Sequence, residues 1–85
     1  MYIDIATDFL VRDSDIVGIF DLDNTTTAGR HTMNFLNEKQ KQGKVEYLIK
    51  DIPKSFVVMK SGQVYVVELN SQILKKRLDV KGETL

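Results

Sequence analysis

Two short apolar runs separated by a glycine turn limit what this chain can fold into. Phe56–Met59 and Val64–Val67 are rich in β-branched and aromatic residues, the composition that strands favour. Ser61 and Gly62 lie between the runs, and glycine readily adopts the positive φ that a tight hairpin loop needs. Because the first run has no polar face, we expect other parts of the chain to cover this hairpin on both sides.

The length of 85 residues predicts one small domain. Such a domain buries only about 60–65% of the surface of its unfolded chain, so self-association would add useful burial. Without cysteine and with one histidine, His31, the chain lacks a disulfide framework and the usual ligands of a zinc site. No signal peptide and no apolar run near the roughly 20 residues of a membrane span is present. We therefore expect a cytoplasmic protein with no metal or other cofactor.

Charge is balanced over the whole chain but unevenly distributed along it. Residues 1–37 carry two arginines against six aspartates, and residues 38–85 carry ten Lys and Arg against six acidic residues, so the formal charges are −4 and +4. A basic half can face nucleic acid. It can equally meet the acidic half of another copy. Two solvated surfaces that fold back near each other would give the same asymmetry.

The N-terminal part indicates three strands. Residues 1–6 place Ile3 and Ile5 on one side, the period of a half-buried strand. Residues 9–11 form a second strand, and a polar turn leads to a nearly all-apolar third strand at residues 16–20. Gly18 has no side chain, so another backbone or a large side chain can pack closely against it.

A long central helix is expected over about residues 28–42, after threonines that can cap its start. Met33, Leu36 and Phe35 would face the core, and Gly43 would end the helix. Its second half is wholly polar and would face water or a partner.

The C-terminal part adds a fourth strand at residues 44–50, the hairpin, and a short helix capped by Asn70 or Ser71. This order predicts an α+β fold: a small, mostly antiparallel β-sheet with one longer central helix and a short C-terminal helix. We expect a single domain over residues 1–78, followed by a polar tail at residues 79–85.

One string suggests an enzyme. Ile19-Phe20-Asp21-Leu22-Asp23-Asn24-Thr25 resembles the first motif of the haloacid-dehalogenase phosphatases, in which Asp21 would attack phosphorus and Asp23 would act as acid and base near magnesium. That family also needs a doubly wound parallel sheet with a Ser/Thr, a Lys and a later acidic pair, and no βαβ series here is long enough to carry them. We interpret the string as a loop and cap cluster, and expect no catalytic or metal-binding residues.

Histidine and aromatic residues offer two further readings. His31, near the start of the predicted helix, is expected to be a neutral surface residue rather than a ligand. Tyr65, Tyr47 and Phe56 could stack nucleic-acid bases, but aromatic residues on strands are more often part of the core.

Two segments resemble a known family. Residues 15–26, Asp-Ile-Val-Gly-Ile-Phe-Asp-Leu-Asp-Asn-Thr-Thr, and residues 52–58, Ile-Pro-Lys-Ser-Phe-Val-Val, resemble the RemB (YaaB-like) branch of the RemA/RemB extracellular-matrix regulators. The ending Leu74-Lys-Lys-Arg-Leu also fits, and the resemblance covers about residues 1–78. It implies a small bacterial cytoplasmic protein linked to transcription of biofilm-matrix genes. The RemA branch is similar to a DNA-binding protein that assembles into homo-oligomeric rings.

The resemblance also indicates where DNA would be contacted. RemA-type chains place arginines just before the strand that Phe56–Met59 resembles; here Asp51 and Ile52 stand at those places, and Lys54 keeps a positive charge nearby. RemA-type chains also have a basic residue near the start of the third strand, where this chain has Asp15. The candidate phosphate-facing residues are Lys54, Lys50 and Lys60, followed by Arg30, Lys39 and Lys41.

The sequence therefore predicts a non-enzymatic, DNA-associated transcriptional regulator of extracellular-matrix genes. It would act as a homo-oligomer larger than a dimer, closing into a ring if the contact between copies permits. DNA binding should be weak, insensitive to sequence and strongly salt-dependent. The alternative is a protein–protein adaptor of the same fold, with an unknown partner, that does not bind DNA itself.

Overall fold

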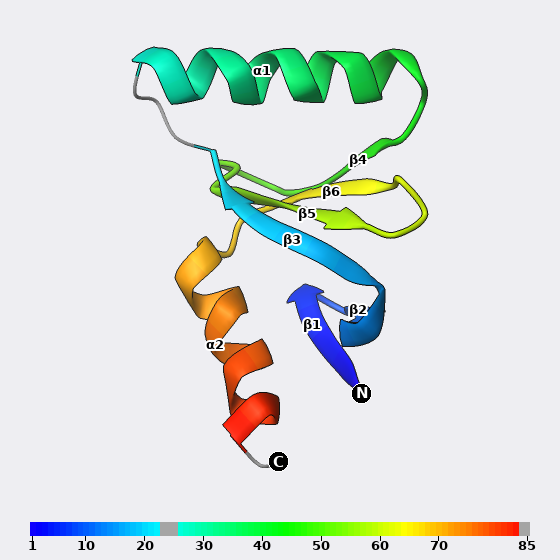
Figure 1. Cartoon of the computed structure of the whole chain (residues 1–85), viewed down its shortest axis with the longest axis vertical. Coiled ribbons are helices and arrows are strands. Elements are labelled where there is room, and N and C mark those ends of the chain that lie inside the picture. The colour runs from blue at the N-terminus through cyan, green and yellow to red at the C-terminus, as the bar shows by residue number, and fades with distance from the viewer. Residues whose placement is uncertain (23–25, 84–85) are drawn as a thin grey trace.

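A four-stranded sheet lies at the centre of the molecule, with helix α1 on one face and a small two-stranded sheet and helix α2 on the other (Figure 1). A computed structural model describes the backbone of residues 1–22 and 26–83, and the side chains of residues 1–22, 31 and 33–78. The elements are β1 (Tyr2–Ala6), β2 (Phe9–Arg12), a 3-10 turn (Asp13–Asp15), β3 (Ile16–Asp21), α1 (Thr26–Lys41), β4 (Val45–Leu48), β5 (Ser55–Met59), β6 (Val64–Val67) and α2 (Ser71–Glu83). The predicted α+β class is confirmed, with the strands divided between two sheets.

The predicted hairpin is formed by β5 and β6. Phe56 pairs with Val66 and Val57 with Tyr65, and Gly62 in the connecting turn has a φ of 92°. Strand β5 is central, because β3 pairs with its other edge. Its uninterrupted apolar sequence fits a strand whose two faces are both covered.

Apolar clusters cover both faces of the hairpin, as expected. On one face Val57 belongs to a core built with side chains of β1, β2 and α2; its buried members are Ile3, Ile5, Val11, Ile19, Val57, Met59, Val67 and Leu74. On the other face Phe56 packs with Val64, Val66 and Leu36 of α1. Alternate side chains of one strand thus join two cores, so the hairpin connects the three layers of the fold.

Helix α1 ends as predicted at Gly43, which has a φ of 71°. The N–H of Lys44 donates to the carbonyl of Lys39 and the N–H of Gly43 to that of Gln40, each at 3.0 Å. This pair of bonds is a Schellman motif, which satisfies carbonyls at the end of a helix and requires a residue with positive φ.

The predicted core side of α1 is only partly right. Leu36 is 5% exposed and buried against the sheet, but Met33 is 54% exposed, so its assignment to the core was wrong. Phe35 lies at the boundary, with its ring stacked 5.9 Å from that of Phe56. Because α1 rests on the sheet along a narrow stripe, a side chain almost one turn before Leu36 stays in solvent.

Strand β3 forms one edge of the large sheet. The Phe20 ring folds over Gly18: a methyl group placed on Gly18 would come within 2.7 Å of two of its ring carbons. The close packing expected at this glycine is therefore confirmed, and the large side chain comes from the same strand. A bulge between Ile16 and Gly18 shifts the pairing with β5.

Strand β4 forms the opposite edge and pairs with β6 in parallel, the exception to the antiparallel pairing of the described strands.

After β6, Asn70 Oδ1 accepts a hydrogen bond of 2.9 Å from the N–H of Ile73 and so caps α2, as predicted. Helix α2 continues to Glu83, beyond the point at which the polar tail was expected to begin, and buries Leu74 completely.

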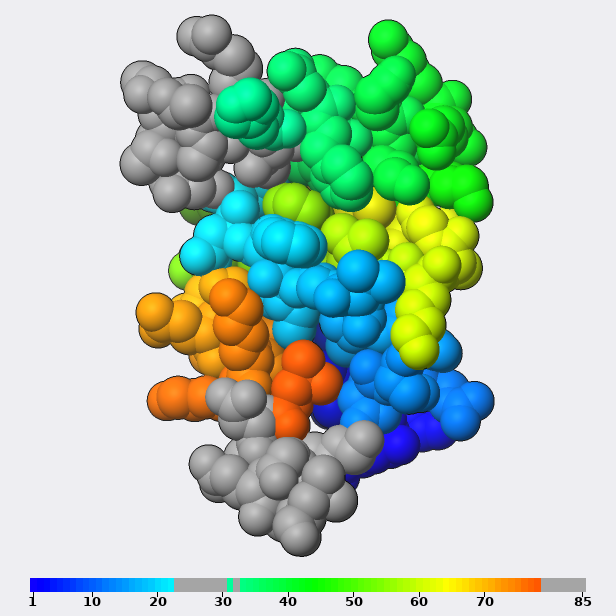
Figure 2. Space-filling model, viewed as in Figure 1, coloured from blue at the N-terminus to red at the C-terminus, as the bar shows by residue number. Residues whose placement is uncertain are grey.

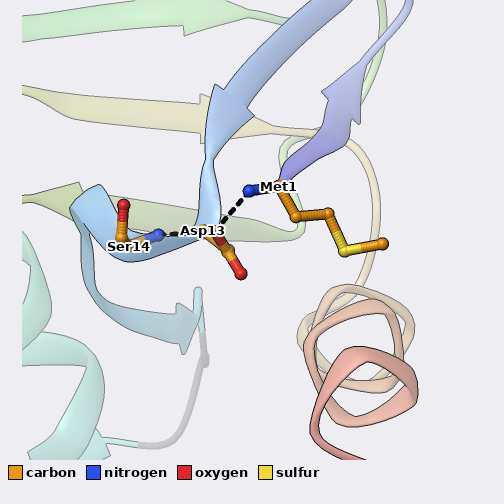
Figure 3. Close-up of polar contacts among 3 residues, drawn as sticks. All are labelled: Met1, Asp13 and Ser14. Carbon is orange, nitrogen blue, oxygen red and sulfur yellow. Dashed lines mark hydrogen bonds and ion pairs between the residues drawn. The ribbon is translucent and has the colours of Figure 1, made fainter. Parts of the chain in front are cut away.

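The start of the chain is joined to the 3-10 turn (Figure 3). The N–H of Asp13 donates to the carbonyl of Met1 at 2.9 Å, and Asp13 Oδ1 lies 3.3 Å from the α-amino nitrogen of Met1. The same carboxylate oxygen accepts a bond of 2.8 Å from the N–H of Ser14. These contacts fix the small sheet beside the beginning of β3.

Candidate nucleic-acid interface

The predicted phosphate-facing lysines lie at two ends of the large sheet. Lys54 directly precedes β5 and Lys60 directly follows it, so about 20 Å of extended chain separates them. Lys50 lies in the loop before Lys54, whereas Lys60 lies in the hairpin turn. The structure therefore brings Lys50 near Lys54 and leaves Lys60 at the other end.

Lys54 is held on a rigid backbone. Its N–H donates to the carbonyl of Val67 at 2.9 Å, and its carbonyl accepts the N–H of Leu22 at 3.0 Å. These two bonds extend the sheet by one residue on both sides of β5, while the Lys54 side chain stays exposed. Because this backbone is fixed, the Lys54 ammonium group can reach an anion from a defined position.

Glu68 lies among these cations. Its Oε1 accepts hydrogen bonds from the backbone N–H groups of Lys50 and Asp51, the second at 3.1 Å. These bonds, with the nearby charges of Lys50 and Lys54, hold the pKa of the Glu68 carboxyl below its usual value. The negative charge of Glu68 offsets part of the positive charge at this end of the sheet.

A cleft of about 620 Å³ lies beside Lys50. It is lined by residues 4–9, 47–50, 68, 69 and 77. On its wall the guanidinium of Arg77 donates from Nη1 to the carbonyl of Asp4. Asp8 lies in the β1–β2 turn with a φ of 57°. Since the lining combines charges of both signs with apolar residues, the cleft is not a purely cationic surface.

The second group of lysines lies at the C-terminal end of α1. Lys39 Nζ lies 5.9 Å from the centre of the Phe35 ring, and Lys44 Nζ donates to the carbonyl of Ser61 at 3.4 Å. Lys41 is exposed on the same last turn. Arg30 belongs to α1, but its side chain lies outside the described residues.

Sequence reasoning missed Lys44, because its contact with the hairpin turn joins segments 17 residues apart. The role of Lys44 is seen only once the structure places the end of α1 beside the hairpin turn.

Of the three aromatic residues considered for base stacking, Phe56 is buried and Tyr65 packs against Phe9 with ring centres 5.0 Å apart. Burial, followed by the negative charge of Glu46, raises the pKa of Tyr65. Tyr47 is exposed and donates from its hydroxyl to Gln40 Oε1 at 3.2 Å. Of these three residues, Tyr47 is the most exposed, at 48%.

The phosphatase-like string has no matching architecture. Asp21 is exposed at the end of β3, opposite Ser55, and Asp23 lies outside the described residues. The surrounding sheet is mixed and four-stranded rather than doubly wound and parallel.

His31 is exposed on α1. Among the described side chains, those of residues 1–22, 31 and 33–78, no three metal-ligating groups gather at one place. Within residues 1–22 and 26–83 no helix has the length and apolarity to cross a bilayer.

These features define a small α+β protein with lysines exposed at both ends of its main sheet. The chain is 39% identical over 77 residues to "Extracellular matrix regulatory protein B" of Bacillus subtilis (strain 168), covering 91% of this chain and 89% of that protein. The chain therefore belongs to the family of extracellular matrix regulatory protein B, which confirms the resemblance seen in the sequence. The relative's name describes a regulatory protein. No protein-family model matches the chain.

Proposed function

We propose that this protein is a non-enzymatic regulator of extracellular-matrix genes that acts on DNA as a homo-oligomer. The observation that carries the proposal is the 39% identity to extracellular matrix regulatory protein B along nearly the whole of both chains. Similarity of this extent includes the segments that place Lys54, β5 and the hairpin.

The distribution of charge supports contact with DNA. Asp4 and Asp8 lie in and beside the small sheet, on the opposite face of the large sheet from Lys39 and Lys41 of α1 (Figure 1). A duplex approaching the α1 side would meet Lys39 and Lys41, whose two positive charges exceed the one negative charge of Glu38 on the same part of the helix. Each neutralised phosphate releases counterions. Lys54, on its fixed backbone, would contact phosphate from the edge of this surface.

The free edges of the large sheet support self-association. The outer edge of β3 has no backbone partner among the described residues, and it carries Val17 and Phe20, which are 64% and 48% exposed. Figure 2 shows the end of β3, in cyan, open to solvent between α1 and α2. Unpaired edges with exposed apolar side chains readily pair with another chain.

Strand directions fit a head-to-tail contact. Strands β3, β6 and β4 all run opposite to β5, so the two edge strands, β3 and β4, point the same way. The β3 edge of one copy could therefore pair in parallel with the β4 edge of the next, which continues the sheet from copy to copy. Such a heterologous contact closes into a ring if its rotation permits.

The proposal is tested by solution mass together with retention on DNA at low and physiological salt. We expect a species larger than a dimer that retains DNA at low salt. Lys54→Ala should abolish retention at moderate salt without changing the mass. Lys75→Ala, at an exposed position of α2, should have much less effect. A monomer at micromolar concentration, or no retention at low salt, would refute the corresponding part of the proposal.

The second candidate is an adaptor that binds another protein and not DNA. It is favoured by the position of Glu68, which offsets Lys50 and Lys54, and by the adjoining cleft with charges of both signs. Co-purification with a protein partner, combined with no DNA retention at low salt, would support this candidate over the first.

A further inference from the structure

The ammonium groups of Lys39 and Lys44 converge on the turn between β5 and β6. A methyl group placed on Gly62 would lie 3.5 Å from Lys44 Nζ and 3.7 Å from Lys39 Nζ. The two nitrogens therefore approach the same point from different elements, one from the last turn of α1 and one from the start of β4. Figure 1 shows these elements and the turn at the same end of the sheet.

Both lysines are positioned by contacts of their own. The Lys44 backbone donates to the carbonyl of Lys39 at 3.0 Å and accepts the N–H of Val64 at 2.8 Å, while its Nζ donates to the carbonyl of Ser61. Lys39 Nζ lies over the Phe35 ring, which is itself stacked on the buried ring of Phe56. Each side chain is partly buried, so less rotamer freedom remains to be lost when a ligand binds.

The pair lacks an anionic partner. Within the described part of the chain neither Lys39 nor Lys44 forms an ion pair with a carboxylate. The end of a helix attracts cations, but the carbonyls of Lys39 and Gln40 there already accept backbone N–H groups. Two like charges directed at one turn repel each other, and an anion between them would relieve that repulsion.

We propose that Lys39, Lys44 and the hairpin turn form a binding site for a phosphate group. A tetrahedral oxyanion has enough acceptor oxygens to receive both ammonium groups at once, as charge-assisted hydrogen bonds. Lys60, in the same turn, adds a third positive charge at this end of the sheet. Gly62 leaves the space beside both nitrogens open, because it has no side chain.

The phosphate can belong to a nucleic-acid backbone or to a free phosphate compound. In the first case the site deepens the proposed function and rests on it, since it would be one of the contacts that hold DNA. In the second case the site exists whether or not the protein binds DNA. The experiment must therefore have one arm for each source.

The first arm uses inorganic phosphate and phosphorus NMR, with sodium chloride matching the ionic strength. The wild type should broaden the phosphate signal saturably, and Lys44→Gln and Lys39→Gln should each weaken binding about tenfold, as expected when one charge-assisted hydrogen bond is removed. Lys75→Gln removes the same charge from α2 and should leave binding unchanged. Equal broadening by the wild type and Lys44→Gln, or none by the wild type, would overturn the site.

The second arm measures retention of a short DNA duplex by the same variants. A loss of about tenfold in Lys44→Gln but not in Lys75→Gln would identify the ligand as a backbone phosphate. Saturable phosphate binding that requires Lys44, with DNA unaffected, would support the site with a free phosphate compound as its ligand. Normal DNA retention without phosphate binding at Lys44 would overturn the site and leave the proposed function intact.

Discussion

The carboxylate of Glu68 accepts a hydrogen bond of 3.1 Å from the backbone N–H of Asp51. A second bond, from the N–H of Lys50, reaches the same oxygen. Together they tie the loop before β5 to the residue that follows β6. This loop carries Lys50 and leads into Lys54, so one acidic side chain both orders the loop and offsets its positive charge.

The first prediction concerns stability in acid. Because the folded state lowers the pKa of Glu68, its contribution to stability is fully present above the pKa of the unfolded chain. That contribution is lost as the pH falls from there through the lower folded pKa. Glu68→Gln should remove this part of the pH dependence, so urea midpoints of wild type and variant should differ at neutral pH and converge in acid. A constant difference at all pH values would contradict the role of the carboxylate.

The same substitution should change DNA binding in the opposite direction. Removing the negative charge of Glu68 leaves the cations of Lys50 and Lys54 less compensated, so Glu68→Gln should retain DNA at higher salt than the wild type. Glu83→Gln, near the end of α2, removes an equal charge elsewhere and serves as the control. If both variants gain equally, net charge alone is responsible and the Lys50–Lys54 end has no special part.

The packing of helix α1 against the sheet should depend on one buried leucine, Leu36. Leu36→Ala should lower the free energy of unfolding by about 2–5 kcal/mol, as expected for a large-to-small change in a core. Met33→Ala, almost one turn earlier on the same helix, should change it by less than about 0.5 kcal/mol, because Met33 is exposed. Urea unfolding of the two variants gives the comparison, and similar losses for both would show that α1 packs differently.

Self-association should depend on the β3 edge. Val17→Lys places a charge on that edge and should lower the solution mass toward that of the monomer without loss of secondary structure. Tyr2→Lys, an exposed position on β1, is the matched control and should leave the mass unchanged. Light scattering and circular dichroism measure the two quantities. A Val17→Lys protein that keeps the wild-type mass would exclude this edge as the contact.

Local signals in the sequence predicted much of the fold. The apolar arms around Gly62, the stop at Gly43 and the cap at Asn70 each depend on residues close in sequence. Pairings between distant segments were beyond such signals, and so was the parallel pairing of β4 with β6. Met33 was misplaced because periodicity gives the direction of a helix face but not the width of the stripe that the sheet covers.

The candidate site was predicted less completely than the fold. The position of Lys54 before a rigid strand followed from the sequence, and the structure supplies the two backbone bonds that hold it. Lys60 was grouped with Lys54 and Lys50 on one phosphate-facing surface, whereas the structure places it at the other end of β5. In contrast, the approach of Lys44 to Ser61 and the bonds of Glu68 to the loop depend on tertiary structure. Family membership confirms the resemblance, and contact with DNA stays a prediction.

The most direct test of the central claim is the salt dependence of duplex binding by the wild-type protein, measured by fluorescence anisotropy. We expect binding at low salt. The logarithm of the binding constant should fall linearly with the logarithm of the salt concentration, with a slope of about −0.9 for each phosphate neutralised. The slope should be nearly the same for unrelated duplex sequences. Lys54→Ala should reduce the magnitude of the slope by about one for each phosphate that the lysine no longer neutralises. An anisotropy that does not change at low salt, at protein concentrations where the oligomer is present, would contradict direct action on DNA.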